Sequence, residues 1–188
     1  MRVISGQARG TKLNSIESIN TRPTLDRVKE SLFNIIRGYI TDEAVVLDLF
    51  SGSGAIGIEF LSRGIQQAYF WEKNPSAVKM IYDNLEKTRL KDKAVVINKD
   101  YKKCLEMCKQ ENIQFDTIYI DPPYQLNIAV DSTKTILNLN LLKENGNIII
   151  ETDDEKRELL ELEKLDVEIY DIRKYGRVSL IFLNQKHK

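Results

Sequence analysis

The most specific chemical signal in the 188-residue sequence is an acid followed by two prolines and a tyrosine, Asp121-Pro122-Pro123-Tyr124. The strand-like run Thr117–Asp121 places the motif where a strand ends, and ligands collect at such ends. The Asp121 carboxylate and the Pro122 carbonyl can each accept a hydrogen bond from an exocyclic amine, while the prolines hold the backbone rigid because their φ is fixed. Tyr124 can stack on the base that carries the amine. The motif therefore predicts amino-group methylation of an unpaired or flipped-out base. The alternative is that these residues only form a turn after the strand.

A second signal lies at the end of another apolar run, Ala44–Phe50, which leads into the glycine-rich turn Ser51-Gly52-Ser53-Gly54 and then a helix. Glycines allow close backbone approach, and free amides at a helix start favour an anionic group. The spacing Gly52-x-Gly54-x-x-Gly57 also fits a dinucleotide site, with Glu72 placed to bind ribose hydroxyls. Asp48 favours S-adenosylmethionine over a dinucleotide, because an acid beside the turn suits the ammonium of a methionine moiety better than a pyrophosphate. We therefore expect S-adenosylmethionine, and NAD remains the alternative.

Asp100 and Tyr101 follow a third strand-like run, Ala94–Asn98. Asp100 can accept a hydrogen bond from an adenine amino group, and Tyr101 can flank the ring. Asp100 can equally serve as the N-cap of a helix over residues 101–109. Both interpretations stay open from the sequence.

The elements that must position these residues alternate along the chain. Apolar runs at Ala44–Phe50, Ala68–Glu72, Ala94–Asn98, Thr117–Asp121 and Asn147–Glu151 are separated by helical patterns, which indicates a parallel sheet with right-handed crossovers. Two later runs, Val167–Arg173 and Val178–Leu183, predict an antiparallel pair that completes the sheet. Ahead of this core, a helix is expected from Thr21-Arg22-Pro23-Thr24 to Gly38. A small N-terminal β-hairpin is predicted from Arg2–Ile4 and Thr11–Leu13.

Composition narrows the class of protein. The net charge is zero, but residues 1–39 hold seven Lys/Arg against three acids, so a polyanion is expected to meet this segment. The one histidine is His187, which excludes His-dependent triads and His-ligated metal centres. Cys104 and Cys108 are expected to be reduced thiols. No apolar segment is long enough to span a bilayer and no signal peptide opens the chain, so we expect one cytoplasmic domain over residues 1–188.

On these motifs the chain resembles the class I methyltransferases that modify amino groups, over residues 44 to about 183. Arg2-Val3-Ile4-Ser5-Gly6, Gly10–Leu13, Thr21–Thr24 and Asp26–Asn34 extend the resemblance to bacterial 16S ribosomal RNA guanine-N2 methyltransferases of the RsmD type. This resemblance implies an α/β Rossmann-like fold with a seven-stranded, mostly parallel sheet flanked by helices and one antiparallel C-terminal strand. It also implies S-adenosylmethionine as donor and the N2 amine of one guanine in the small ribosomal subunit as acceptor.

The resemblance also assigns roles to individual residues. The catalytic set is Asp121, Pro122, Pro123 and Tyr124. The cofactor-binding set is Asp48, Phe50, Ser51, Gly52, Ser53, Gly54, Glu72, Lys73, Asp100 and Tyr101. The enzyme is expected to be a monomer without a metal, with residues 1–43 in contact with RNA. The RNA set is Arg2, Arg9, Lys12, Arg22, Thr24 and Arg27, with Tyr124 at the base. Two departures from the family pattern are Asn74, where Asp is expected, and the bulky pair Phe70-Trp71.

Other functions compete with this one. An adenine-N6 DNA methyltransferase or another RNA amino-methyltransferase shares the chemistry, but residues 1–43 leave little room for the target-recognition region that the DNA enzyme needs. A protein-glutamine methyltransferase would carry Asn in place of Asp121. An NAD-dependent oxidoreductase would leave residues 121–124 unexplained, and a non-catalytic ribosome-assembly factor would not need the acids.

Overall fold

The computed structural model describes residues 1–15, 22–123 and 127–186, and the side chains of residues 22–25 fall outside this description. The strands are β1 (Val45–Leu49), β2 (Gln67–Trp71), β3 (Ala94–Ile97), β4 (Phe115–Ile120), β5 (Leu142–Thr152), β6 (Val167–Tyr175) and β7 (Val178–Gln185). The α-helices are α1 (Arg22–Ile35), α2 (Ala55–Ser62), α3 (Pro75–Thr88), α4 (Tyr101–Gln110), α5 (Ile128–Asn138) and α6 (Glu155–Leu162), with short 3-10 helices η1 (Arg37–Tyr39) and η2 (Lys91–Lys93). Within this part of the chain, no helix has the length and apolar character needed to cross a membrane.

The strands form one sheet in the order β3-β2-β1-β4-β5-β7-β6. Strands β1 to β5 pair in parallel, and β7 is antiparallel to both of its neighbours. The predicted mostly parallel sheet with one antiparallel strand near the C-terminus is therefore confirmed. Strand β5 begins five residues before its predicted start at Asn147. The first part was missed because the stretch 143–145 is polar and does not resemble a buried strand. The strand order reverses between β1 and β4, and ligands bind at such a switch point.

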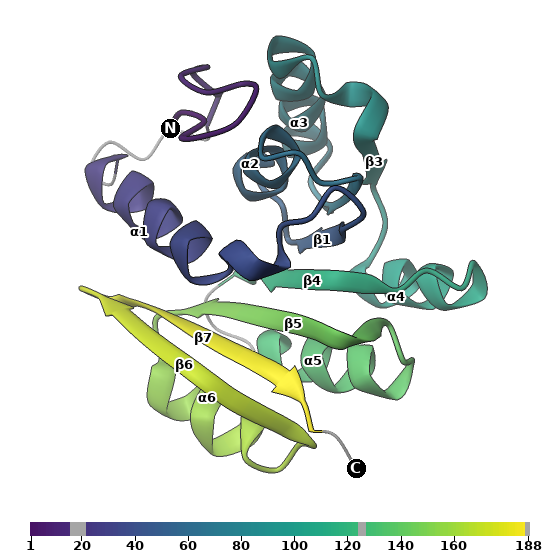
Figure 1. The fold of residues 1–188 in the computed structure, drawn as a ribbon. Helices are drawn as coiled ribbons and strands as arrows, with labels where there is room; N and C mark the ends of the chain where they lie inside the picture. Colours follow the sequence, from purple (N-terminus) through teal and green to yellow (C-terminus); the bar gives the residue numbers. More distant parts are fainter. Residues whose placement is uncertain (16–21, 124–126, 187–188) are drawn as a thin grey trace.

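The two faces of the sheet have separate hydrophobic cores, because successive side chains of a strand point to opposite faces. Val46, Phe70 and Tyr119 pack in one core with residues of α1, α2 and α3. Leu47, Ile118 and residues of α4, α5 and α6 form the other. Figure 1 shows α1 and α2 on the opposite side of the sheet from α5 and α6.

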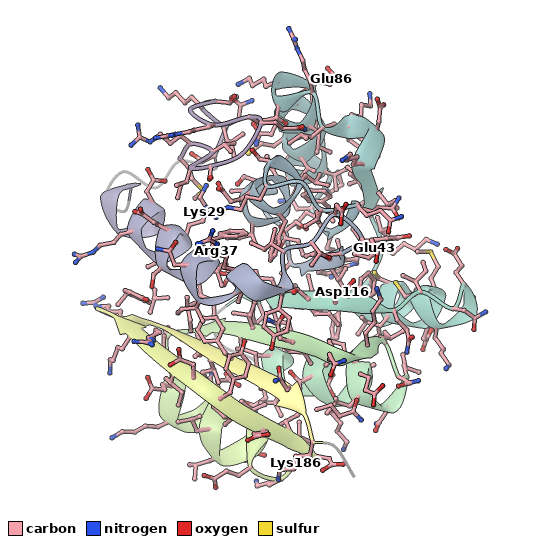
Figure 2. The ribbon with its side chains drawn as sticks, in the orientation of Figure 1. Lys29, Arg37, Glu43, Glu86, Asp116 and Lys186 are labelled. Carbon is pink, nitrogen blue, oxygen red and sulfur yellow. The ribbon has the colours of Figure 1, made fainter. Side chains whose placement is uncertain are left out.

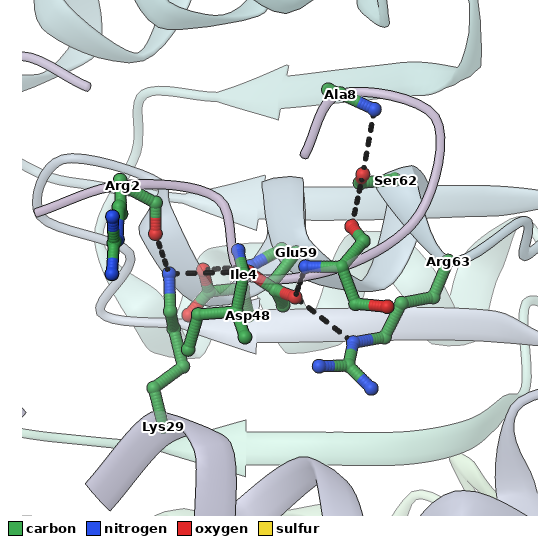
Figure 3. Close-up of polar contacts among 10 residues, drawn as sticks. Arg2, Ile4, Ala8, Lys29, Asp48, Glu59, Ser62 and Arg63 are labelled. Carbon is green, nitrogen blue, oxygen red and sulfur yellow. Dashed lines mark hydrogen bonds and ion pairs between the residues drawn. The ribbon is translucent and has the colours of Figure 1, made fainter. Parts of the chain in front are cut away.

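The predicted N-terminal hairpin is not formed as two strands. One isolated antiparallel bridge, between Arg2 and Lys12, replaces it. Backbone hydrogen bonds from Val3 to Thr11 and from Leu13 to Met1 flank the bridge. The pairing goes no further, because the next amides, of Ile4 and Ser5, donate to the Glu59 carboxylate of helix α2 at 2.8 and 3.0 Å. Further along, the Ala8 amide donates to Ser62 Oγ at 3.0 Å, as Figure 3 shows. The segment is therefore closed by a short pairing of its own and is fastened to α2 as well.

Glu59 is the centre of this attachment and has no exposed surface. Besides the two amides, it forms ion pairs with Arg63 at 2.9 Å and with Lys29 of α1 at 3.2 Å. Lys29 Nζ also donates to the Arg2 carbonyl at 2.6 Å, and Figure 2 shows Lys29 pointing from α1 into the molecule. Burial lowers the pKa of Lys29, and the Glu59 charge opposes that shift. We call the residues Arg2, Lys29, Glu59 and Arg63 the Glu59 clasp.

Gly57 sets how closely α2 lies on the sheet. A Cβ at this position would lie 2.3 Å from the buried Phe70 ring. We expect Gly57→Ala to lower the free energy of unfolding by about 1–3 kcal/mol, because the overpacked ring has to shift. Urea denaturation measures the change. Gly38→Ala is the matched control, since a Cβ at Gly38 meets nothing within 4 Å, and equal losses in the two variants would contradict the packing explanation.

Candidate active site

The turn after β1 has an unusual backbone. Phe50, Gly52 and Gly54 have φ of 71°, 54° and 77°, all in the left-handed region. Glycine adopts this region readily, whereas a phenylalanine there is uncommon and such strain clusters at functional sites. The Phe50 ring is held against Trp71 and Tyr101, with centroids 4.8 and 5.6 Å apart. The sequence pattern predicted the glycine-rich turn but gave no sign that Phe50 has a left-handed backbone.

Asp48 lies at the end of β1 with only 2% of its surface exposed. Its Oδ2 accepts the Gly57 amide of α2 at 3.0 Å, so the protein itself supplies one anion to this helix start. The Gly52 and Gly54 amides also donate within the protein, to Glu72 Oε2 at 2.9 Å and to the Ser51 carbonyl at 2.7 Å. That an anionic ligand binds other amides of this turn stays a prediction.

Glu72 follows β2 and connects two segments of the rim. Its second oxygen, Oε1, accepts the Asn74 amide at 2.8 Å. Asn74 in turn accepts the Ser76 amide at 2.9 Å and is the N-cap of α3, a role that Asn and Asp fill equally well. Each carboxylate oxygen has a second lone pair, so Glu72 can still accept hydroxyl donors from a ribose. The neighbouring Lys73 is exposed.

Asp100 and Tyr101 open α4 on the same rim. Asp100 is the N-cap, its Oδ1 accepting the Lys102 amide at 3.1 Å, so the capping interpretation is confirmed and the adenine role stays a prediction. Tyr101 donates its hydroxyl to Asp131 of α5 at 2.5 Å. Its ring therefore has a fixed position beside Phe50.

The acid of the Asp-Pro-Pro motif comes next to the glycine turn. Asp121 follows β4, and its amide donates to the Leu49 carbonyl of β1 at 3.4 Å. Pro122 is buried and Pro123 is exposed, whereas Tyr124 lies outside the described residues. A cavity of about 230 Å³ lies between these strand ends and helix α1. It is lined by Met1, Val28, Lys29, Leu32, Asp48, Phe50, Ser51, Gly52, Ser53, Ala55, Ile56, Tyr119, Asp121 and Glu151.

Three acids with a raised pKa line this cavity. Burial raises the pKa of Asp48 to about 7, although the Gly57 hydrogen bond opposes the shift. Burial also raises the pKa of Asp121 well above its usual range, and the charges of Glu151 and Asp48 add to the effect. The pKa of Glu151 is raised by burial and lowered in part by its hydrogen bond from Tyr119. Such groups in a concave site are typical of catalysis or of binding a cation.

Sequence reasoning missed Glu151, Tyr119 and Lys29 as residues of the site. Glu151 belonged to a predicted strand whose end was expected on this rim, and that was the one signal that could have identified it. Tyr119 and Lys29 are buried at 2% exposure each and carry no local motif. Only the fold brings them to the cavity.

The structure divides the predicted RNA residues between two places. Arg2, Arg9 and Arg27 line one groove of about 660 Å³ between the N-terminal segment and α1, together with Asp26 and Glu30. Lys12 lies in a separate groove with Lys79 of α3. The side chains of Arg22 and Thr24 lie outside the described residues.

Comparisons with known proteins identify the family and the fold. The family described as Conserved hypothetical protein 95 matches residues 1–184. Ribosomal RNA small subunit methyltransferase D of Haemophilus influenzae is 37% identical over 83% of this chain and 80% of its own, and the Escherichia coli K12 protein of the same name is 35% identical over 78% and 68%. The solved structure of yhhF from Escherichia coli superposes with a TM-score of 0.81 at 25% identity, covering 100% of this chain and 99% of that one.

The titration of Asp48 predicts how cofactor affinity depends on pH. Only ionised Asp48 attracts an ammonium group, and it loses its charge as the pH falls through about 7. We expect the affinity for S-adenosylhomocysteine, measured by calorimetry, to fall about tenfold from pH 8 to pH 6. Asp48→Asn should bind more weakly at pH 8 and lose most of this dependence. A wild-type affinity that does not change over this range would contradict the assignment.

Proposed function

The chain belongs to the family described as Conserved hypothetical protein 95, and we propose that it is an S-adenosylmethionine-dependent methyltransferase that modifies the N2 amine of one guanine in 16S rRNA. The observation that carries the proposal is that Asp121 and the glycine turn line one cavity at the switch point of the sheet. Relatives named ribosomal RNA small subunit methyltransferase D support the substrate class. The residues 44–183 would form the catalytic core, and residues 1–43 the RNA-contacting extension.

The residues on the rim fit the donor. Asp48 would hold its ammonium, Glu72 its ribose hydroxyls, and Asp100 with Tyr101 its adenine. A cavity of about 230 Å³ is small for a whole ligand of this size, so we place only the methionine end and the target amine inside it. The rest of the donor would lie along the rim toward β2 and β3. When bound, the donor supplies an electrophilic methyl group on a sulfonium.

Asp121 has the central chemical role. A guanine N2 amine is a poor nucleophile because its lone pair is delocalised into the ring. The Asp121 carboxylate and the Pro122 carbonyl would each accept a hydrogen bond from one of its N–H groups and so localise that pair toward the methyl group. A carboxylate whose pKa is raised by burial is also a stronger proton acceptor, so Asp121 would take the proton that the amine loses as the new N–C bond forms.

The arginine groove would hold the RNA backbone. Arg2, Arg9 and Arg27 are exposed and line one groove, and guanidinium groups bind phosphates in bidentate geometry. The groove includes residues from α1, whose Val28, Lys29 and Leu32 also line the cavity. RNA bound along the groove would therefore lie close to the site of transfer.

The function itself is tested by mapping methylated nucleotides of 16S rRNA by mass spectrometry. Cells that lack this protein should have lost the N2 methyl of one guanine, and re-expression should restore it. Asp121→Ala should fail to restore it while keeping S-adenosylhomocysteine affinity within a few-fold, because the variant loses a transition-state interaction. An unchanged map in the deletion strain would rule out the proposed substrate, and an equal loss of cofactor binding would rule out the role of Asp121.

The RNA interface predicts a change in salt dependence. We expect Arg9→Ala and Arg27→Ala each to weaken binding to small-subunit particles and to reduce the slope of log affinity against log salt by roughly 0.7–0.9, the value for one lost phosphate contact. Filter binding over a salt series measures the slope. Arg37→Ala is the matched control, since Arg37 is exposed but lies beyond the end of α1, away from the groove lining. A reduction of the same size in the control would contradict the assignment.

A further inference from the structure

Glu151 lines the cavity on the side that the cofactor residues leave open. Asp48 lies in β1 and the glycine turn follows it, Glu72 follows β2 and Asp100 follows β3, and these strands all lie on one side of β4. Glu151 lies near the end of β5, on the other side of β4. Asp121 at the end of β4 therefore separates the proposed donor site from Glu151.

The sheet register puts Glu151 level with Asp121. Ile120 of β4 pairs with Ile150 of β5, and the two acids follow these partners by one residue each. Both acids line the same cavity, and the charge of Glu151 contributes to the raised pKa of Asp121. A group that is bound by Asp121 would therefore have Glu151 as its neighbour.

Tyr119 fixes the orientation of Glu151. The Tyr119 hydroxyl donates to Glu151 Oε2, and the two side chains are 2% and 8% exposed. A buried carboxylate is costly unless its oxygens find donors. A carboxylate offers about four lone-pair sites, and Tyr119 uses one of them. Glu151 thus has acceptor capacity for a donor that enters the cavity.

The base that such a pair of acids favours follows from its hydrogen-bonding edge. Guanine presents two adjacent donors, N1–H and the N2 amine, whereas adenine and cytosine present an acceptor nitrogen beside their amines. We propose that Glu151 determines the specificity of the reaction by accepting the guanine N1–H while Asp121 accepts from N2, with Tyr119 as the residue that positions Glu151. This inference rests on the proposed function and deepens it.

The test compares two bases that share the amine and differ at N1. Small-subunit particles are rebuilt from ligated 16S rRNA that carries guanine or 2-aminopurine at the methylated position. 2-Aminopurine keeps the amine but has an acceptor at N1, so the wild-type kcat/KM should favour guanine about tenfold or more. In Glu151→Gln the side-chain amide can donate to that acceptor, so the preference should fall to about threefold or less. Tyr119→Phe should lower the preference by a smaller factor.

Glu155→Gln is the control, because Glu155 accepts from Ser179 at 2.6 Å at the start of α6, outside the cavity lining. It should keep the wild-type preference. The proposal is overturned if Glu151→Gln reduces activity on both bases equally, as a role only in supporting Asp121 would give, or if its preference is unchanged. Wild-type protein that methylates neither particle would instead refute the proposed function, so the two failures are distinguishable.

Discussion

The site depends on how one buried carboxylate is accommodated near the end of β1. Asp48 is almost fully buried and accepts the Gly57 amide at 3.0 Å. A single hydrogen bond to a helix start offsets only part of the cost of burying a charge, so burial still raises the pKa of Asp48 to about 7. The strand, the turn and α2 are therefore arranged around an acid that gains a charge partner when a cation binds.

A second buried acid connects this turn to the N-terminal extension. Glu59 lies on α2, the helix that the glycine turn opens, and the Glu59 clasp joins α2 to α1 and to the first residues of the chain. An acid with no exposure would be strongly destabilising if unpaired, and here Lys29, Arg63 and two amides satisfy it. The arginine groove and the cavity are both lined by α1, which the clasp holds against α2.

The sequence predicted what depends on local pattern and failed where partners are distant. Apolar runs that end in Asp48 and Asp121 were sufficient to predict the strands and the edge where these acids meet. The predicted hairpin is reduced to one bridge, because its strand-like residues gave no sign that Glu59, more than 50 positions away, accepts the amides of Ile4 and Ser5. Glu151 was missed for a similar reason: its relation to Asp121 exists only through the register of β4 and β5.

The charge balance of the cavity favours the methyl donor over a dinucleotide. Asp48, Asp121 and Glu151 all line it, and the one lysine in the lining, Lys29, is already paired with Glu59. A pyrophosphate would add negative charge beside acids whose pKa values are already raised by burial and by one another. A ligand with an ammonium and a sulfonium would instead stabilise their ionised forms. Burial disfavours the charged forms of these carboxylates in the free protein, and the positive charges of the ligand that the reaction requires would offset that penalty.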